Sequence, residues 1–213
     1  MLSLYSCAIK TVQTKFDVIN TEYKIRHRRN PIHSISSRMK KSSSIIEKLQ
    51  RNNVPVSVEN IRLFIHDVAG IRVICFYLDD VYDVAEMILA QRDVTLIKQK
   101  DYISEPKHNG YRSLHLILSV PIYFSGQIEQ VETEVQIRTI AMDFWASLEH
   151  RLKYKKDITE ESNIIERLRI CAETIAKTDT DMLQIRRSIE KYADIPTEDE
   201  ILFENLRNID ISI

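Results

Sequence analysis

Three short segments of the chain carry side chains that could do chemistry. The first, H-D-V-A-G-I-R over residues 66–72, places Asp67 and a glycine directly before an apolar run that indicates a buried strand. The second, residues 101–115, holds two cations, two tyrosines and two histidines around an Asn-Gly pair. The third, E-T-E-V-Q-I-R-T over residues 132–139, alternates strictly. Carboxylates, cations and an imidazole are groups that bind a metal ion or move a proton.

The Asn-Gly pair predicts a turn between two strands. Gly110 follows Asn109 between β-prone runs, and glycine tolerates the positive φ that such turns demand. The chain has only 3 Gly in 213 residues, against a usual share of ~7%, so a glycine at this place points to a backbone constraint. Taken alone, the segment also fits a polar hairpin loop with solvated cations.

The alternating segment predicts a strand with two unlike faces. One face would carry Val131, Thr133, Val135 and Ile137, and the other Glu132, Glu134, Gln136 and Arg138. Four polar positions on one face indicate either a solvated edge strand or the wall of a polar site. The helix expected directly afterwards disfavours a simple exposed sheet face.

The bulk properties restrict the class of protein. A chain of 213 residues and 25.0 kDa suits one domain of ordinary size with extra helices. The formal net charge of -1 gives no global basic field for nucleic acid or a membrane surface. The three cysteines lack metal-binding spacing, and there is no apolar run of ~18 residues. These properties predict a cytoplasmic globular protein.

Hydrophobic periodicity and turn residues predict the elements that must position these segments. In chain order they are helix 3–28, strand 32–40, helices 42–52 and 57–66, strand 71–78, helix 80–92, strands 94–103, 111–120 and 130–138, and helices 140–154 and 160–192, with a short helix after Pro196. The fold class is therefore α+β, with a mixed or mostly antiparallel sheet flanked by helices. We divide the chain into an N-terminal helix (1–30), a central domain (31–156) and a C-terminal helical extension (157–213).

The three segments, in this order, resemble the synthetase domain of RelA/SpoT-type enzymes, and the stand-alone small alarmone synthetases match best. The matching stretch runs from about residue 38 to residue 156. The resemblance implies a nucleotidyltransferase-like fold. It also implies transfer of pyrophosphate from ATP to the 3′-hydroxyl of GTP or GDP, giving (p)ppGpp and AMP.

Side-chain cations must hold the ATP phosphates if this resemblance is correct. The chain has neither G-x-x-x-x-G-K-[ST] nor G-x-G-x-x-G, so a glycine-rich phosphate cradle is absent. The resemblance implies ATP contacts at Arg38, Lys48 and Arg72, with Lys40 on the same strand face as Arg38. A cation near the place of Lys100 holds adenine in relatives. It is often Arg there, and Lys stacks less well on a flat ring.

The resemblance also assigns the metal and the acceptor nucleotide. Asp67 and Glu134 match the Mg²⁺-binding carboxylates, and Glu134 is also placed to accept the proton of the attacking hydroxyl. In relatives the residue matching Tyr111 stacks on guanine, and those matching Lys107 and His115 lie along the GTP phosphates. Gln136 would lie near the acceptor and Asp143 at the guanine edge. We interpret three further motif residues as packing and hydrogen-bonded support: Trp145, Glu149 and His150.

Two other functions fit parts of the sequence. His66 and Asp67 could be the metal pair of an HD-type phosphohydrolase, but that site needs an all-helical scaffold and longer flanking segments. The chain could also be a non-catalytic nucleotide- or RNA-binding module, although such a module has no need of two metal-binding acids.

We expect a homotetramer built through the terminal helices. Short relatives are tetramers, and apolar stripes recur at helical spacing in residues 3–28 and 160–192. In some relatives (p)ppGpp binds a central cleft through an aromatic-x-Thr pair on the first strand. Ser34 and Ser36 stand at those places here, so we expect no strong activation by pppGpp.

Overall fold

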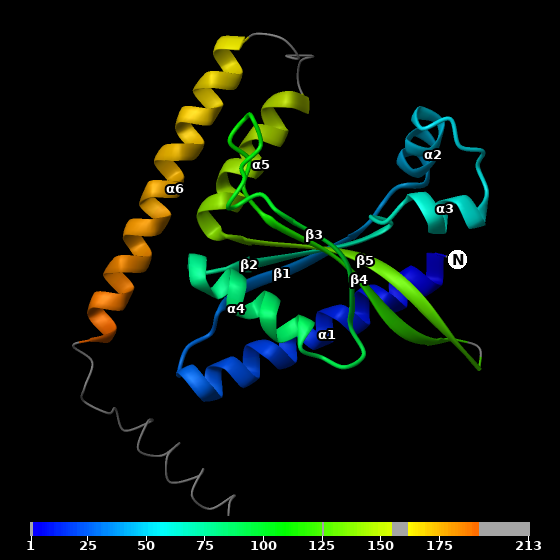
Figure 1. Cartoon of the computed structure of the whole chain (residues 1–213), viewed down its shortest axis with the longest axis horizontal. Coiled ribbons are helices and arrows are strands. Elements are labelled where there is room, and N and C mark those ends of the chain that lie inside the picture. The colour runs from blue at the N-terminus through cyan, green and yellow to red at the C-terminus, as the bar shows by residue number, and fades with distance from the viewer. Residues whose placement is uncertain (1, 125, 155–161, 192–213) are drawn as a thin grey trace, which may run out of the picture.

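One five-stranded sheet organises the chain (Figure 1). The computed structural model describes residues 2–124, 126–154 and 162–191. Its elements are α1 Leu2–His27, β1 Ile32–Met39, α2 Ser42–Arg51, α3 Val58–Phe64, β2 Ala69–Cys75, α4 Leu78–Leu89, β3 Thr95–Asp101, β4 Leu114–Phe124, β5 Gln127–Thr139, α5 Ile140–Tyr154 and α6 Ser162–Glu190. The strand order is β1-β2-β5-β4-β3, with β2 and β5 parallel and the other neighbours antiparallel. The predicted α+β class with a mixed sheet is confirmed.

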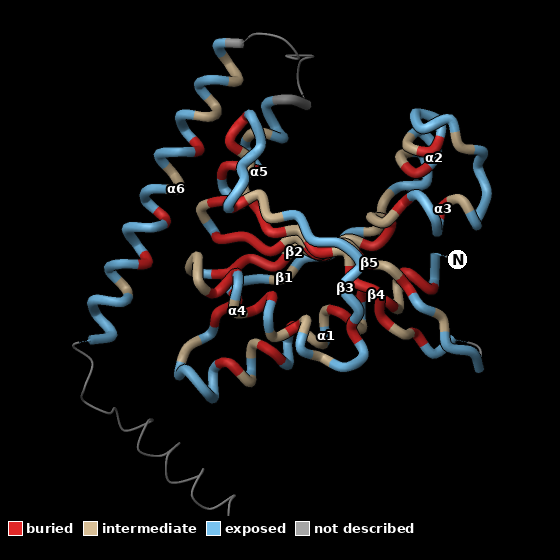
Figure 2. Tube along the Cα trace, viewed as in Figure 1, coloured by how far each residue is buried: buried red, intermediate tan, exposed pale blue. Residues whose placement is uncertain are grey.

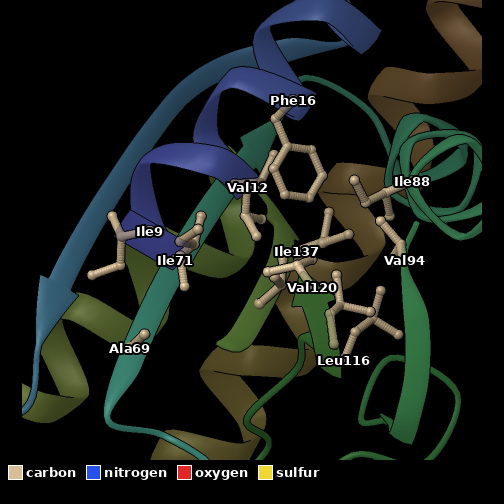
Figure 3. Packing of buried hydrophobic residues seen from close by; sticks show 14 of the residues in the cluster. Ile9, Val12, Phe16, Ala69, Ile71, Ile88, Val94, Leu116, Val120 and Ile137 are labelled. Atoms are coloured by element: carbon tan, nitrogen blue, oxygen red, sulfur yellow. The ribbon is translucent and has the colours of Figure 1, made fainter. Parts of the chain in front are cut away.

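Helices α1 and α4 cover one face of the sheet and form the core with it (Figure 1). The apolar positions that recur at helical spacing along α1 are buried: Ala8, Val12, Phe16, Ile19 and Tyr23. Figure 3 shows Val12 and Phe16 packed toward inward side chains of the sheet, among them Ile71 and Ile137. The apolar stripe of α1 is therefore buried within its own protomer.

The opposite face of the sheet is polar. Helices α2 and α3 flank it at one end, and α5 and α6 flank it at the other (Figure 1). Figure 2 shows burial concentrated in β2, β4 and β5 and in the parts of α1 and α4 that face the sheet. Because β5 lies between β2 and β4, its polar positions lie in the middle of this open face. The solvated-edge interpretation of residues 132–139 is thus wrong, and the alternative, the wall of a polar site, remains.

Several element boundaries differ from the sequence predictions. Strand β4 begins at Leu114, three residues after the predicted start, because residues 107–111 close a hydrogen-bonded turn. Helix α4 begins earlier than predicted, where the Asp80 carboxylate accepts a hydrogen bond from the Tyr77 backbone N–H at 3.2 Å. A serine cap is found at α3, where the Ser57 hydroxyl accepts from the backbone N–H of Asn60. It is absent at α2, whose N-cap is Lys41.

Among the described residues, no helix is both long and apolar enough to cross a membrane. The short helix predicted after Pro196 lies outside the described residues.

Candidate active site

Two rows of side chains run across the strands on the open face of the sheet. Strand register aligns Ser36, Arg72, Gln136, His115 and Lys100 in one row, from β1 through β2, β5 and β4 to β3. The neighbouring row contains Arg38, Gly70, Glu134, Ile117 and Lys98. Neighbouring strands are ~4.8 Å apart, so residues that are distant in sequence form one continuous surface.

Asp67 lies in the turn before β2 and is held by two lysines. Its Oδ2 is 2.5 Å from Nζ of Lys40, and its Oδ1 is 2.9 Å from Nζ of Lys48 on α2. The backbone N–H of Lys40 also donates to the carbonyl of Val68 at 2.9 Å, which fixes the end of β1 beside the turn. Burial raises the pKa of the Asp67 carboxyl, but the two ammonium groups outweigh burial and hold it below the usual range. Asp67 is therefore ionised at neutral pH.

A cavity of about 130 Å³ opens beside these groups, between β1 and β2. Its wall includes Arg38, Gly70, Arg72 and Gln136. Gly70 brings no side chain to the floor, and a Cβ added there would lie 3.6 Å from Cγ of Arg38. The cavity thus presents two guanidinium groups over bare backbone, an arrangement suited to an anionic group.

Glu134 on β5 connects the cavity with the residues of β4. Its Oε1 lies 3.3 Å from Nδ1 of His115, and its Oε2 accepts a hydrogen bond from Nε2 of Gln136 at 3.1 Å. Burial raises the pKa of the Glu134 carboxyl, but the hydrogen bond from His115 and its positive charge hold the net pKa below the usual range. Like Asp67, this carboxyl is ionised at neutral pH.

Asp67 and Glu134 are the carboxylates that could hold a divalent cation. Gly70, which follows Asp67 by three residues, pairs with Glu134 across β2 and β5, and the negative charge of Asp67 acts to raise the pKa of Glu134. In residues 2–124, 126–154 and 162–191 there is no group of three or more His, Cys, Asp and Glu suited to a metal ion. Mg²⁺ needs no such cage, because it takes one or two carboxylates together with waters and phosphate oxygens. The acid pair fits Mg²⁺ on these grounds.

An aromatic and cationic cluster lies on the other side of Glu134. Oη of Tyr111 is 2.8 Å from Nε2 of His115, whose Nδ1 lies 3.3 Å from Oε1 of Glu134, so the imidazole connects the tyrosine to the carboxylate. Nζ of Lys107 lies 4.8 Å from the centroid of the Tyr111 ring and 4.7 Å from that of Tyr102. Tyr111 precedes β4 rather than belonging to it, yet its side chain reaches His115.

A buried arginine connects this cluster to the rest of the face. Arg138 has a side chain only 2% exposed, and it donates to Gln136 and, at 3.2 Å, to Oη of Tyr111. Asp143 at the start of α5 lies between two cations, 3.3 Å from Arg72 and 3.5 Å from Arg138. Burial lowers the pKa of the Arg138 guanidinium. Asp143, predicted at the guanine edge, thus joins the acceptor residues to Arg72, a predicted ATP contact.

The structure brings the predicted site residues to this one face. They are Arg38, Lys40, Lys48, Asp67, Arg72, Lys100, Lys107, Tyr111, His115, Glu134, Gln136 and Asp143. Lys100 lies farthest out, on edge strand β3, with β5 and β4 between it and Arg72. Sequence reasoning missed Arg138 and Tyr102 as parts of the cluster. The strict alternation of β5 did place Arg138 on the polar face, whereas no local pattern singled out Tyr102.

The supporting role predicted for three motif residues is confirmed for two. Nε1 of Trp145 donates to the carbonyl of Leu168 at 3.0 Å, and Oε1 of Glu149 accepts from Nδ2 of Asn109 at 3.0 Å. His150 is exposed on α5, so the packing role expected for it is wrong.

Comparison with known proteins matches both the segments and the fold. A family described as a region found in RelA / SpoT proteins matches residues 37–159. The chain is 41% identical to the GTP pyrophosphokinase YwaC of Bacillus subtilis over 189 residues, which cover 89% of this chain and 90% of the relative. It is 35% identical to the GTP pyrophosphokinase YjbM of the same organism over 188 residues, 88% of this chain and 87% of the relative.

A solved structure agrees with these matches. The small alarmone synthetase 1 from Bacillus subtilis, bound to its product pppGpp, has a TM-score of 0.80 and 36% identity to this chain. The match covers 88% of this chain and 95% of that one.

Proposed function

Since the chain belongs to the RelA/SpoT family, we propose that it is a GTP pyrophosphokinase acting in alarmone synthesis. It transfers the pyrophosphoryl group of ATP to the 3′-hydroxyl of GTP or GDP, forms (p)ppGpp and releases AMP. One observation carries the proposal. Two ionised acids, Asp67 and Glu134, meet on one open face, with phosphate-binding cations on one side and an aromatic, imidazole-containing cluster on the other.

The ATP side is formed by β1, β2 and α2. Arg38 and Arg72 line the cavity and would bind phosphate oxygens through paired N–H donors. Lys40 and Lys48 would neutralise further phosphate charge near Asp67. Lys100, three strands from Arg72 and thus ~14 Å away, would lie against the adenine. The cations bind and orient ATP for in-line transfer, which is most of what such a reaction requires of a protein.

Asp67 and Glu134 would hold Mg²⁺, which when bound neutralises charge on the transferring phosphates. Because both carboxyls have a lowered pKa, they are ionised and available as oxygen ligands at neutral pH.

Glu134 would also receive the proton of the attacking 3′-hydroxyl. Its hydrogen bonds with His115 and Gln136 fix the direction of the carboxylate, so no reorientation is needed during transfer.

The acceptor side is formed by the 107–111 turn, β4 and the end of β5. Tyr111 would stack on guanine, and Lys107 and His115 would lie along the acceptor phosphates, with the Lys107 ammonium supplying positive charge. Gln136 and Asp143 would hydrogen-bond the acceptor nucleotide, since both are held in place by Arg138.

The phosphohydrolase alternative lacks support in the described residues. His66 pairs with Glu132 at 2.5 Å, and β2 follows Asp67 almost at once, so the neighbourhood is not helical. The decisive experiment incubates the purified protein with ATP, Mg²⁺ and labelled GTP. AMP and a more highly phosphorylated guanosine product support the proposal. Release of phosphate or pyrophosphate would instead indicate a hydrolase, and no turnover would indicate a binding module.

We propose that the assembly is a homotetramer, and that only the C-terminal helices build it. Helix α1 buries its stripe on its own sheet, so we assign the contacts between protomers to α5 and α6. Exposed apolar side chains recur every fourth residue along α5, and others lie on α6: Ile140, Phe144, Leu148 and Leu152, then Met182, Ile185 and Ile189. Light scattering should give the mass of four 25.0 kDa protomers, about 100 kDa. A mass near 25.0 kDa would reject this assembly.

We also propose that pppGpp does not activate this protein strongly. Ser34 and Ser36 on edge strand β1 are exposed and present neither an aromatic ring nor a threonine methyl. Several-fold stimulation of turnover by added pppGpp would contradict this point and leave the tetramer unaffected.

A further inference from the structure

Helix α6 is in close contact with the 107–111 turn, which carries Lys107 and Tyr111. Gly110 has φ +89, a conformation that L side chains rarely adopt. A Cβ added to Gly110 would lie 2.5 Å from Cβ of Ala172 and 3.2 Å from Cα of Arg169. The first distance is shorter than real Cβ contacts allow. The turn and the helix thus touch with no room for another carbon atom.

The same turn places both Lys107 and Tyr111. The backbone N–H of Gly110 donates to the carbonyl of Lys107 at 2.8 Å, and that of Lys107 donates to the carbonyl of Tyr111 at 3.2 Å. Oδ1 of Asn109 accepts from the backbone N–H of Tyr111 at 3.2 Å. Because these bonds close the turn on itself, a displacement of Gly110 moves Lys107 and Tyr111 together.

The Tyr111 side chain also rests on a small second core that α6 helps to build. This cluster consists of Trp145, Ala146 and Ala172, with Tyr111, Leu168 and Ile175 packed against it. The indole N–H of Trp145 donates to the carbonyl of Leu168, which ties α5 to α6 at this level. The ring proposed to stack on guanine is therefore seated on residues of α6.

Contacts farther along fix α6 against the rest of the molecule. Oγ1 of Thr139 donates to the carboxylate of Asp179 at 2.6 Å. Near the end of the helix, Arg186 and Arg187 both pair with Asp79 of α4, the latter at 3.2 Å. With three attachments along its length, α6 is a firm support. It also lies outside residues 37–159, the part matched by the family.

We infer that Ala172 is a positioning residue for the acceptor nucleotide, and that α6 sets the place of the 107–111 turn through its contact with Gly110. The inference rests on the proposed assignment of Lys107 and Tyr111 to the acceptor. A side chain larger than alanine at position 172 would displace the turn and with it both acceptor contacts. The ATP side is formed by other elements, β1, β2 and α2.

The first test is Ala172→Leu in the full-length protein, with Thr174→Leu as control because Thr174 is exposed on the same helix. The KM for GTP should rise about tenfold, since small misplacements of a binding group have effects of this order. The KM for ATP should stay within about twofold, and Thr174→Leu should change neither value. Equal changes in both KM values, or none, would overturn the inference.

A rescue experiment covers the case in which Ala172→Leu does not fold. Gly110→Ala should raise the KM for GTP, because the new Cβ overlaps Cβ of Ala172. Adding Ala172→Gly removes that overlap and should lower the KM for GTP several-fold again. The recovery is incomplete because the strained φ remains. Adding Thr174→Gly instead weakens the helix equally but relieves no overlap, so it should restore nothing. Equal recovery from both second substitutions, or recovery from neither, would contradict the inference.

Tyr111→Ala, assayed alongside, distinguishes a failure of the acceptor assignment from a failure of the role of α6. If it leaves the KM for GTP unchanged, the acceptor assignment itself has failed. If it raises that KM while Ala172→Leu does not, the assignment stands and the role of α6 has failed.

Discussion

The two sides of the open sheet face hold their charged groups in different ways. On the ATP side the cations are partly solvated. The side chains of Lys48 and Arg72 are 40% and 38% exposed, and each has one ion-pair partner among the described residues. On the acceptor side, Arg138 is 2% exposed and contacts three side chains at once.

Because of this difference, we expect the two sides to respond differently to substitution. Solvated cations lose little when one partner is removed, because water replaces it. A buried, cross-connected network loses much more, because each orphaned group keeps its desolvation cost. We therefore expect changes on the ATP side to act singly on ATP binding, and changes on the acceptor side to spread to several groups.

Glu134 belongs to both sides, and its substitution should have the largest effect. Glu134→Gln keeps the shape but removes the charge and the basicity, so turnover should fall by about 10² or more with folding intact. Asp67→Asn should behave similarly and weaken the Mg²⁺ dependence of ATP binding. The control is Glu132→Gln, on the same face but paired with His66. Near wild-type turnover of pure Glu134→Gln protein with Mg²⁺ would falsify the mechanism.

Arg138→Met tests whether the acceptor network acts as a unit. The substitution removes the partner of Gln136, Tyr111 and Asp143 while keeping a long side chain. Taking one partner from each of these three groups, in a site where Arg138 is 2% exposed, should lower kcat/KM for GTP by about 2 kcal/mol, roughly thirtyfold. Arg38→Met, on the ATP side, is the matched change and should raise the KM for ATP alone. If both variants changed the same single parameter, the two sides would not differ as described.

Tyr111→Ala should cost the acceptor about 1–3 kcal/mol if the ring stacks on guanine. The KM for ATP should not follow. Tyr111→Phe keeps the ring and loses only the hydroxyl contacts with His115 and Arg138, so its effect should be smaller. An unchanged KM for GTP in Tyr111→Ala would show that Tyr111 does not bind the acceptor nucleotide.

The smallest effect is expected at Lys100, the outermost residue of its row. Lys100→Arg offers a planar guanidinium to the adenine and should lower the KM for ATP about two- to fivefold, the worth of an exposed cation–π contact. Lys98→Arg on the same strand is the control. No change in the KM for ATP would place the adenine elsewhere.

The sequence predicted on which face of a strand or helix a side chain lies, but it did not predict which strands lie side by side. Alternation along residues 132–139 was enough to put Glu134 and Gln136 on the polar face, and helical spacing was enough to bury Phe16. These are local periodicities, set by the geometry of a single element. Which strand lies beside which is decided by long-range packing, so the insertion of β5 between β2 and β4 has no local signal.

The same reasoning explains the features that sequence patterns missed. Gly110 was identified as a turn glycine from its neighbours alone, and its positive φ confirms this. The second reason for a glycine there is the approach of Ala172, sixty-two positions later, which no window around the turn could reveal. Likewise, Tyr102 precedes the turn and joins the cluster only because β3 folds back along β4.

The central position of β5 has a consequence for the timing of synthesis. Chains emerge from the ribosome N-terminus first, and β5 is the last of the five strands to be made. Until then β2 and β4, its neighbours on either side, lack the strand that joins them, so the half-made sheet exposes two unpaired edges. Glu134 arrives with that same strand. A nascent or truncated chain therefore cannot act on nucleotides before its sheet closes, and it is most prone to aggregation in that interval.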